Sequence, residues 1–341
     1  MDALAHQTLA PFEIGIRAGQ TWPRLGHFPR ELLSNAYKVH DKPGLPGWKH
    51  RLKFIARGIA SPRLSQDWFD LWQTPGLTPL VQSHPRLLLK LQRPYLMRGL
   101  NTRQRWQVLR QHYSFAFKYF TASAFQEIFT VPGAVVAGLP VVNSGHFSLR
   151  LLYHNLYEKE GELSLVLYDE TKQARVFTLT FCVCWRHAGR PEIFIGGLQG
   201  FKAGYDHESV VAITREMHGL RPKALLLFTL QEISSLWDVT AIRAVSNQTR
   251  NLPHDDREIR ADYDEFWLES GGCLGTDGNF TLPLAFNPRA LSTIRPNKRS
   301  LYRQRYEMLA GVSSTIRQNM DRLSGACSHS APACEQCRIA V

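Results

Sequence analysis

The chain has 341 residues, of which 44% are apolar and 21% charged, a composition that excludes wholesale disorder. Six cysteines are too few for a disulfide-stapled scaffold. The sequence contains no charge-free run of about 18 apolar residues, so it predicts no transmembrane helix. The first residues, which include Asp2 and Glu13, lack the pattern of a secretory signal, so we expect a cytoplasmic protein.

The excess positive charge is concentrated in one part of the chain. Residues 17–118 contain 18 Lys and Arg but four Asp and Glu, whereas residues 119–341 contain 23 of each sign. This basic block predicts an acidic or anionic-lipid partner, which would place the protein at the inner membrane surface. Nucleic acid is a less favoured partner. A solvated basic face explains the same pattern equally well.

The first part of the chain, residues 1–125, reads as mainly helical. Short helical patterns cover residues 30–37 and 48–60, and further segments cover 80–91 and 102–120, with prolines between them. In the second of these, one face gathers the apolar residues Trp48, Leu52, Ile55, Ala56 and Ile59. We expect that face to pack into the core, with binding to an anionic membrane as the alternative.

The pattern changes to alternating strands over residues 126–323. Strands at 162–168, 175–185 and 192–198 predict an antiparallel meander, preceded by valine-rich segments around 135–142. Helices are then expected at 209–217, 222–237, 262–270 and 299–323, and strands at 241–246 and 280–286. The class predicted is α+β with one mixed sheet, followed by a flexible tail at 324–341.

A turn at residues 215–223 carries the clearest chemical signal. Gly219 precedes a long apolar helix that begins at Pro222, and Arg215, Arg221 and Lys223 lie beside its start. Unpaired amides and the helix dipole at such a start favour an anion, most readily a phosphate or pyrophosphate. The alternative is an ordinary helix start whose basic residues face water.

This segment resembles the cofactor loop of the GCN5-related N-acyltransferase superfamily. The resemblance implies acyl-coenzyme A as cofactor, held by Arg215, Gly219, Arg221 and Lys223, and transfer of its acyl group to an amine acceptor. It also implies close approach of the ligand to Gly196 and Gly197, and amide contacts from Gln199 and Asn247. The alternatives are a β-bulge at the glycines, which the sequence alone favours, and strand-end capping by the two amides. Two departures weaken the match: Arg221 replaces the second glycine of the loop, and Trp267 stands where the superfamily has a proton-donating tyrosine.

The same resemblance suggests where catalytic groups lie. Acyl transfer needs a base for the amine and a proton for the departing thiolate. Candidate bases are His146 and Glu265, and Tyr263 is the candidate proton donor. Each has a structural alternative, because a lone histidine or a core tyrosine more often serves packing or hydrogen bonding.

Longer motifs resemble the VirK/YbjX family of bacterial proteins over about residues 20–323. They include Ile195–Gly200, His218–Lys223, Val245–Asn247, Tyr263–Trp267 and Lys298–Tyr306. The family is associated with virulence and envelope integrity and implies no settled reaction. A non-catalytic accessory protein on a degenerate transferase fold is therefore the alternative function.

The C-terminal tail contains Cys327, Cys334 and Cys337 with His329 nearby. Three thiols and an imidazole could complete a zinc shell, but a single Cys-x2-Cys pair is a weak signal. We expect incidental tail cysteines and no metal.

Overall fold

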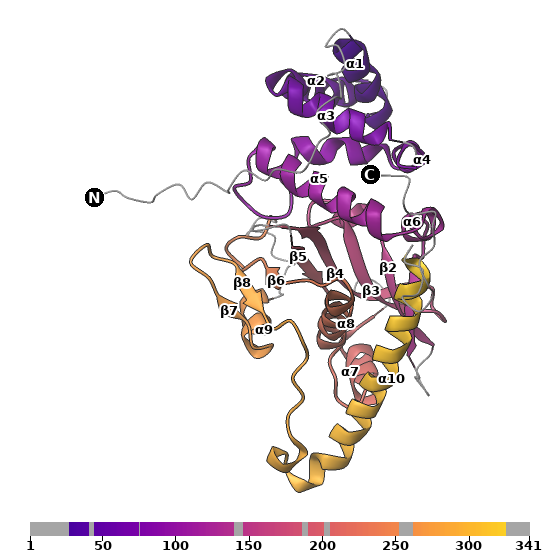
Figure 1. Cartoon of the computed structure of the whole chain (residues 1–341), viewed down its shortest axis with the longest axis vertical. Coiled ribbons are helices and arrows are strands. Elements are labelled where there is room, and N and C mark those ends of the chain that lie inside the picture. Colours follow the sequence, from indigo (N-terminus) through magenta and orange to yellow (C-terminus); the bar gives the residue numbers. More distant parts are fainter. Residues whose placement is uncertain are drawn as a thin grey trace, which may run out of the picture.

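The structure is a computed structural model that describes residues 27–40, 44–74, 76–139, 146–185, 190–200, 205–251 and 262–324. Helices occupy one end of the molecule and an eight-stranded mixed sheet occupies the middle (Figure 1). This arrangement confirms the predicted α+β class. Among the helices within the described ranges, none has the length and apolar character needed to cross a bilayer.

The N-terminal end is built from short helices that prolines and caps delimit. They are α1 (Phe28–Val39), α2 (Leu45–Ala60), α3 (Pro62–Trp72), α4 (Thr78–Ser83), the 3-10 helix η2 (Pro85–Gln92), α5 (Thr102–Tyr119) and α6 (Ala122–Phe129). Proline occupies one of the first two positions of α1 to α4 and of η2, where its missing N–H costs nothing. The predicted segment at 80–91 is divided at Pro85 for this reason.

The sheet has the strand order β1-β2-β3-β4-β5-β6-β8-β7. Strands β1 (Ala134–Leu139), β2 (Phe147–Leu152), β3 (Leu163–Asp169), β4 (Ala174–Cys184) and β5 (Glu192–Gln199) form an antiparallel meander. Strand β6 (Ala241–Ala244) then pairs parallel to β5, and β8 (Phe280–Leu282) and β7 (Cys273–Leu274) complete that side. The meander is thus longer than the three strands predicted, and the last strand ends before Pro283 rather than at residue 286.

Helices α7 (His207–Glu216) and α8 (Pro222–Leu236) connect β5 to β6, and α9 (Tyr263–Glu269) follows β6. Helix α10 (Arg299–Leu323) runs beside α8 and the edge strand β1 (Figure 1), where the Asn319 side chain donates to the Val136 carbonyl at 3.0 Å. One continuous hydrophobic core includes residues from α1 through α10.

Helix α2 turns a different face to the core from the one predicted. Trp48, Leu52 and Ile59 are 57%, 44% and 62% exposed, whereas Phe54 is 1% exposed and stacks on Phe69. Ile55 packs against the core, but the prediction is wrong for Trp48, Leu52 and Ile59, because the apolar spacing indicates which residues share a face but not which part of it meets a neighbour.

A fully buried ion pair joins the N-terminal helices to the sheet. Lys90 of η2 lies 2.7 Å from the Glu162 carboxylate just before β3, and the two side chains are 2% and 1% exposed. Lys90 also donates to the Gly161 carbonyl at 3.0 Å, and the Tyr113 hydroxyl of α5 donates to the other oxygen of Glu162. Every charge in this contact is therefore compensated, which a buried ion pair requires.

We expect Lys90→Met to destabilise the fold by about 3–5 kcal/mol, because it leaves the Glu162 carboxylate buried without its counter-ion. Urea unfolding followed by circular dichroism measures the effect. Lys49→Met at an exposed site of α2 serves as control and should change the free energy of unfolding by less than about 0.5 kcal/mol. A Lys90→Met loss no larger than that of the control would contradict this role.

His112 is a second buried titratable group between helix and sheet. Its Nδ1 accepts the Val183 N–H of β4 at 3.1 Å, which requires the neutral ring. Burial, followed by the charge of Lys90, lowers the pKa of His112 from 6.5 to about 3. The unfolded chain therefore binds more protons than the folded one over this range, and stability falls as the pH drops below 6.5.

We expect His112→Asn to remove this part of the acid sensitivity, since the Asn oxygen can accept the same N–H. Between pH 6.5 and pH 3, the wild type should lose on the order of 4 kcal/mol more stability than the variant. Urea melts at a series of pH values measure the difference in slope. Parallel slopes for the two proteins would show that His112 does not stay neutral in the fold.

Candidate functional site

The turn around Gly219 does not present free amides. His218 and Gly219 have φ values of +52° and +76°, so the chain folds back over the end of α7, as helix C-caps do. The Gly219 N–H donates to the Thr214 carbonyl at 2.8 Å, and the Leu220 N–H donates to the Met217 carbonyl at 2.9 Å. Arg305 of α10 donates twice to the His218 carbonyl, at 2.7 and 3.0 Å. The prediction of unpaired amides at this turn is therefore wrong.

The basic side chains at the start of α8 lie against α9. Arg221 forms an exposed ion pair with Glu269 at 2.6 Å, and the Lys223 ammonium lies 4.4 Å from the centre of the Phe266 ring. Arg215 is exposed at the end of α7. The arrangement docks α8 on α9 and does not fit a pyrophosphate cradle built from backbone amides.

Strand β5 parts from β6 halfway along its length. Pairing runs from Glu192 to Ile195, and the Val245 N–H still reaches the Ile195 carbonyl at 3.0 Å. Gly196 then forms a bulge against β4, and Gly197–Gln199 continue beyond the end of β6. Bulges bend a strand and redirect its backbone groups, so the two parallel strands diverge at the carboxyl end of β5.

Tyr263 of α9 fills this divergence. Its hydroxyl oxygen accepts the Leu198 N–H at 2.9 Å and the Gln199 amide at 3.3 Å. The hydroxyl proton is therefore left to be donated elsewhere. Burial, followed by the charge of Glu160, raises the pKa of Tyr263 above its ordinary range, so the phenol is protonated at neutral pH.

Two further polar side chains meet Tyr263. Glu160, which is 4% exposed, accepts from the Gln199 amide at 2.8 Å, and its carboxylate packs where a side chain at Gly197 would stand. Arg250 is 7% exposed, and its guanidinium lies 5.6 Å from the centre of the Tyr263 ring. Its Nε and Nη1 atoms are buried without a hydrogen-bond partner among the described residues. We name Glu160, Gln199, Arg250 and Tyr263 the buried polar cluster.

The other predicted residues lie apart from this cluster. His146 is exposed at the start of β2, three strands and about 14 Å from β5. Glu265 is exposed on α9. The Asn247 side chain joins the end of β6 to α9, donating to Asp262 at 2.8 Å and accepting the Tyr263 N–H at 3.1 Å. The structure thus gathers Gly196, Gly197, Gln199 and Tyr263 and leaves His146 and Glu265 outside.

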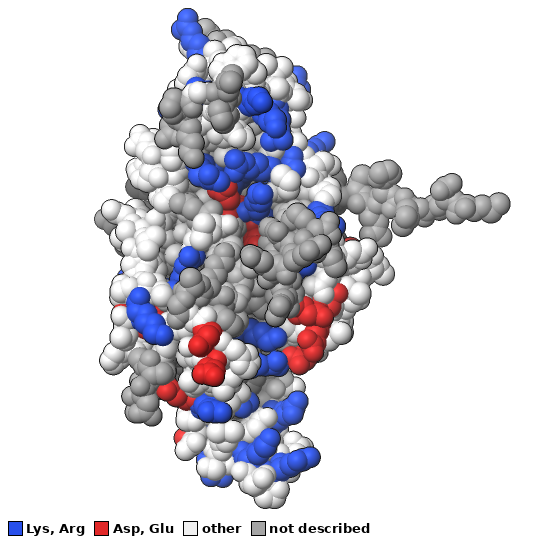
Figure 2. All heavy atoms as spheres, turned by 180° about the vertical axis from the view of Figure 1, so that it is seen from behind, with Lys and Arg blue, Asp and Glu red and all other residues white. Residues whose placement is uncertain are grey.

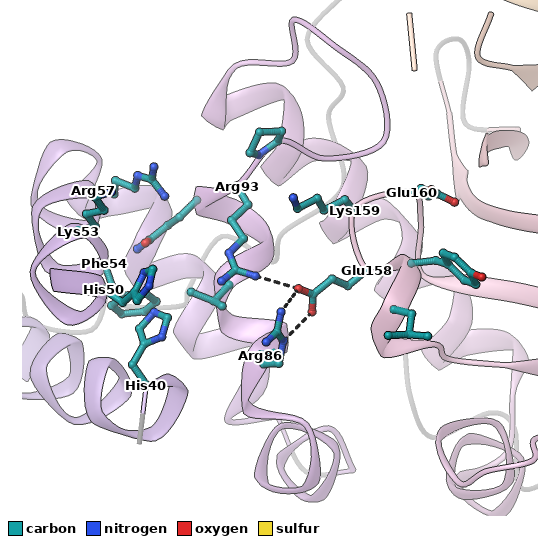
Figure 3. A pocket seen from close by; sticks show the side chains of 15 residues that line it. His40, His50, Lys53, Phe54, Arg57, Arg86, Arg93, Glu158, Lys159 and Glu160 are labelled. Atoms are coloured by element: carbon teal, nitrogen blue, oxygen red, sulfur yellow. Dashed lines mark hydrogen bonds and ion pairs between the residues drawn. The ribbon is translucent and has the colours of Figure 1, made fainter. Parts of the chain in front are cut away.

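A cavity of about 600 Å³ opens between the N-terminal helices and the segment before β3 (Figure 3). Its wall includes five Lys and Arg side chains, two histidines and two glutamates: Lys53, Arg57, Arg86, Arg93, Lys159, His40, His50, Glu158 and Glu160. Seen from behind, a band of Lys and Arg crosses the upper part of the molecule with a few Asp and Glu just below it, and further Lys and Arg lie over the lower half (Figure 2). We name this space the basic cavity.

Glu160 belongs to both features, because it lines the basic cavity and bonds to Gln199 in the buried polar cluster. Sequence reasoning missed Glu160, Arg250 and the cavity residues. The run Glu158-Lys159-Glu160-Gly161-Glu162 could have drawn attention to them, but its charge and glycine are typical of a solvated turn. In the structure Glu158, Glu160 and Glu162 are only 6%, 4% and 2% exposed.

Comparison with known proteins identifies relatives over most of the chain. Residues 45–318 match the family described as "Protein of unknown function (DUF535)". The chain is 35% identical over 268 residues to the uncharacterized protein YbjX of Escherichia coli K12, covering 77% of this chain and 81% of YbjX. It is 25% identical over 276 residues to an uncharacterized protein of Haemophilus influenzae, covering 80% and 88%. The resemblance to the VirK/YbjX family drawn from the motifs is confirmed.

Among solved structures, a point mutant of a cAMP-binding acyltransferase from Mycobacterium smegmatis aligns with 65% of this chain and 63% of its own, at 9% identity and a TM-score of 0.25. An overlap this slight carries no argument about function.

We expect Gly197→Ala to destabilise the protein by about 1–3 kcal/mol, the usual cost of overpacking, because its methyl group would overlap the Glu160 carboxylate. Gly138→Ala in β1 is the matched control, since open space surrounds that position. Urea unfolding measures both. Equal stability of the two variants would show that Glu160 does not occupy the place described.

Proposed function

The chain belongs to the VirK/YbjX family, matched by DUF535, and we propose that it transfers an acyl group from an activated thioester such as acyl-coenzyme A to an amine. The observation that carries the proposal is the Tyr263 hydroxyl, which is held by two donors at the point where β5 parts from β6. A protonated phenol fixed in this way is suited to supply a proton to a departing thiolate.

Each member of the buried polar cluster has a part in this reaction. Glu160 takes the proton of the attacking amine as the C–N bond forms, and Tyr263 gives its proton to sulfur as the C–S bond breaks. The proton held by Glu160 then restores Tyr263, so the amine loses one proton and the thiol gains one. Arg250, whose Nε and Nη1 have no hydrogen-bond partner within the described ranges, supplies positive charge for the oxyanion of the tetrahedral intermediate.

Glu160 therefore takes the role that the sequence suggested for His146 or Glu265. Gln199 donates to both Glu160 and Tyr263 and so holds the base and the acid next to each other. The bulge at Gly196 and the lack of a side chain at Gly197 let Glu160 approach the strand, a position no residue with a Cβ could share.

A second candidate is a non-catalytic ligand-binding protein on the same fold. It is favoured by the burial of Tyr263 and Glu160, which are 2% and 4% exposed, because substrates must reach groups that react. The two functions make different predictions for Tyr263: the enzyme needs its hydroxyl for turnover, whereas the ligand-binding protein needs it only for the stability of the fold.

We expect Tyr263→Phe to lower the rate of thiol release by at least about 100-fold, the usual contribution of general acid catalysis. The assay measures the rate at which free thiol is released. The acyl donors are acetyl-coenzyme A, a long-chain acyl-coenzyme A and an acylated carrier protein, and the acceptors are polyamines and amino acids. Tyr37→Phe at an exposed site on α1 is the control and should keep the full rate.

Thermal melts of both variants at the assay pH confirm that they are folded. If the wild type releases no thiol from any donor, or if folded Tyr263→Phe keeps the wild-type rate, the acyl-transfer proposal fails. In the first case the non-catalytic candidate remains.

A further inference from the structure

The basic cavity gathers cations from three separate segments of the chain. Lys53 and Arg57 come from α2, Arg86 and Arg93 from η2 and its C-cap, and Lys159 from the segment before β3. Figure 3 shows Lys159 reaching into the space from the wall opposite Arg57 and Arg93. Residues this far apart in sequence converge only through the docking of the N-terminal helices on the sheet.

Protein carboxylates compensate only part of this charge. Glu158 is shared by two guanidinium groups, with its Oε1 2.6 Å from Arg86 and 2.8 Å from Arg93. Glu160 is turned to Gln199. Within the described residues, Lys53, Arg57 and Lys159 have no carboxylate within ion-pair distance, so the cavity keeps an excess of about three positive charges.

The neighbouring titratable groups respond to this charge. Burial, followed by His50, Arg93, Arg86 and Arg51, lowers the pKa of His40. Burial also lowers the pKa of Arg93, where the opposing charge of Glu158 is offset in part by Arg86 and Arg57. Like charges held together in a partly buried space repel each other, and a bound anion relieves that repulsion.

The dimensions and donors of the cavity select the anion. A volume of about 600 Å³ is far larger than one chloride ion needs and falls in the range of small-molecule sites. Guanidinium groups match the oxygens of phosphate in pairs, and lysines add point charges. A singly charged carboxylate would leave the excess positive charge uncompensated, whereas a pyrophosphate or two phosphomonoesters would balance it.

We propose that the basic cavity binds the phosphorylated end of a ligand that carries at least two phosphate charges, with Lys53, Arg57, Arg93 and Lys159 as the binding residues. Glu158, which also pairs with Arg86, holds Arg93 in place. Because Glu160 connects the cavity to Tyr263, the rest of the ligand extends toward the buried polar cluster. Identifying this ligand with the acyl donor rests on the proposed function, whereas the phosphate site does not.

Isothermal titration calorimetry of the full chain with inorganic pyrophosphate tests the site. The double variant Lys53→Gln/Arg57→Gln should weaken binding at least 10-fold. The matched control is Lys49→Gln/Arg63→Gln, which removes the same charge from exposed positions of α2 and α3 outside the cavity and should change the affinity less than 2-fold. Equal losses in both variants, or no binding to the wild type, would overturn the proposal.

A second readout locates the ligand without any substitution. Pyrophosphate in the cavity adds negative charge beside His40. An NMR titration of the histidines should therefore show that pyrophosphate raises the pKa of His40, whereas the signal of exposed His146 should not respond to pyrophosphate. No change at His40 on saturation with pyrophosphate would also overturn the proposal.

Two further arms identify the source of the phosphate. If the wild type binds coenzyme A and the Lys53→Gln/Arg57→Gln variant does not, the phosphate belongs to a soluble acyl donor. Binding of phosphatidic acid vesicles but not of phosphatidylserine vesicles, lost in the same variant, supports a lipid headgroup. Tyr263→Phe should keep wild-type affinity for pyrophosphate. If pyrophosphate binds in the cavity but no thioester reacts, the phosphate site stands and the acyl-transfer proposal falls.

Discussion

The buried contact between Lys90 and Glu162 fixes the geometry on which both sites depend. It holds η2 against the segment that enters β3, and that segment carries three carboxylates at every second residue. Glu162 meets Lys90 and Tyr113, Glu160 meets Gln199, and Glu158 meets Arg86 and Arg93. One short stretch of chain therefore ties the helices to the sheet, supplies the carboxylate of the buried polar cluster and orients Arg86 and Arg93 in the basic cavity.

Close approach of backbone makes this stretch fit. A side chain at Gly161 would collide with the Phe181 backbone of β4, and one at Gly196 with the Glu160 carbonyl. Glycine at these positions lets the segment lie directly on the sheet. The bulge at Gly196 then turns β5 away from β6, and α9 places Tyr263 and Trp267 in the space between, where the Trp267 indole donates to the Val245 carbonyl at 2.9 Å. The divergence of the strands and the position of Glu160 are thus parts of one packing solution.

Sequence predicted those elements whose pattern is local. The bounds of α10 and the strands β3 to β5 follow from apolar periodicity and turn residues, and the motifs identified the family. Tyr263 and Gln199 were found because they lie in such motifs. Glu160 and Arg250 were not, because their burial is imposed by segments distant in the chain. The face of α2 and the amides at Gly219 were mispredicted for a related reason: local spacing does not reveal that Phe54 meets Phe69 or that α7 uses those amides.

The uncovered face of α2 has a consequence for spectroscopy. Trp68, Trp72 and Trp267 are no more than 2% exposed, whereas Trp48 is 57% exposed. An aqueous collisional quencher such as iodide will act on Trp48 far more readily than on those three indoles. Trp48 lies on the helix that supplies Lys53 and Arg57 to the cavity wall. The quenching of its fluorescence should therefore change when a molecule binds to that helix or when the helix moves.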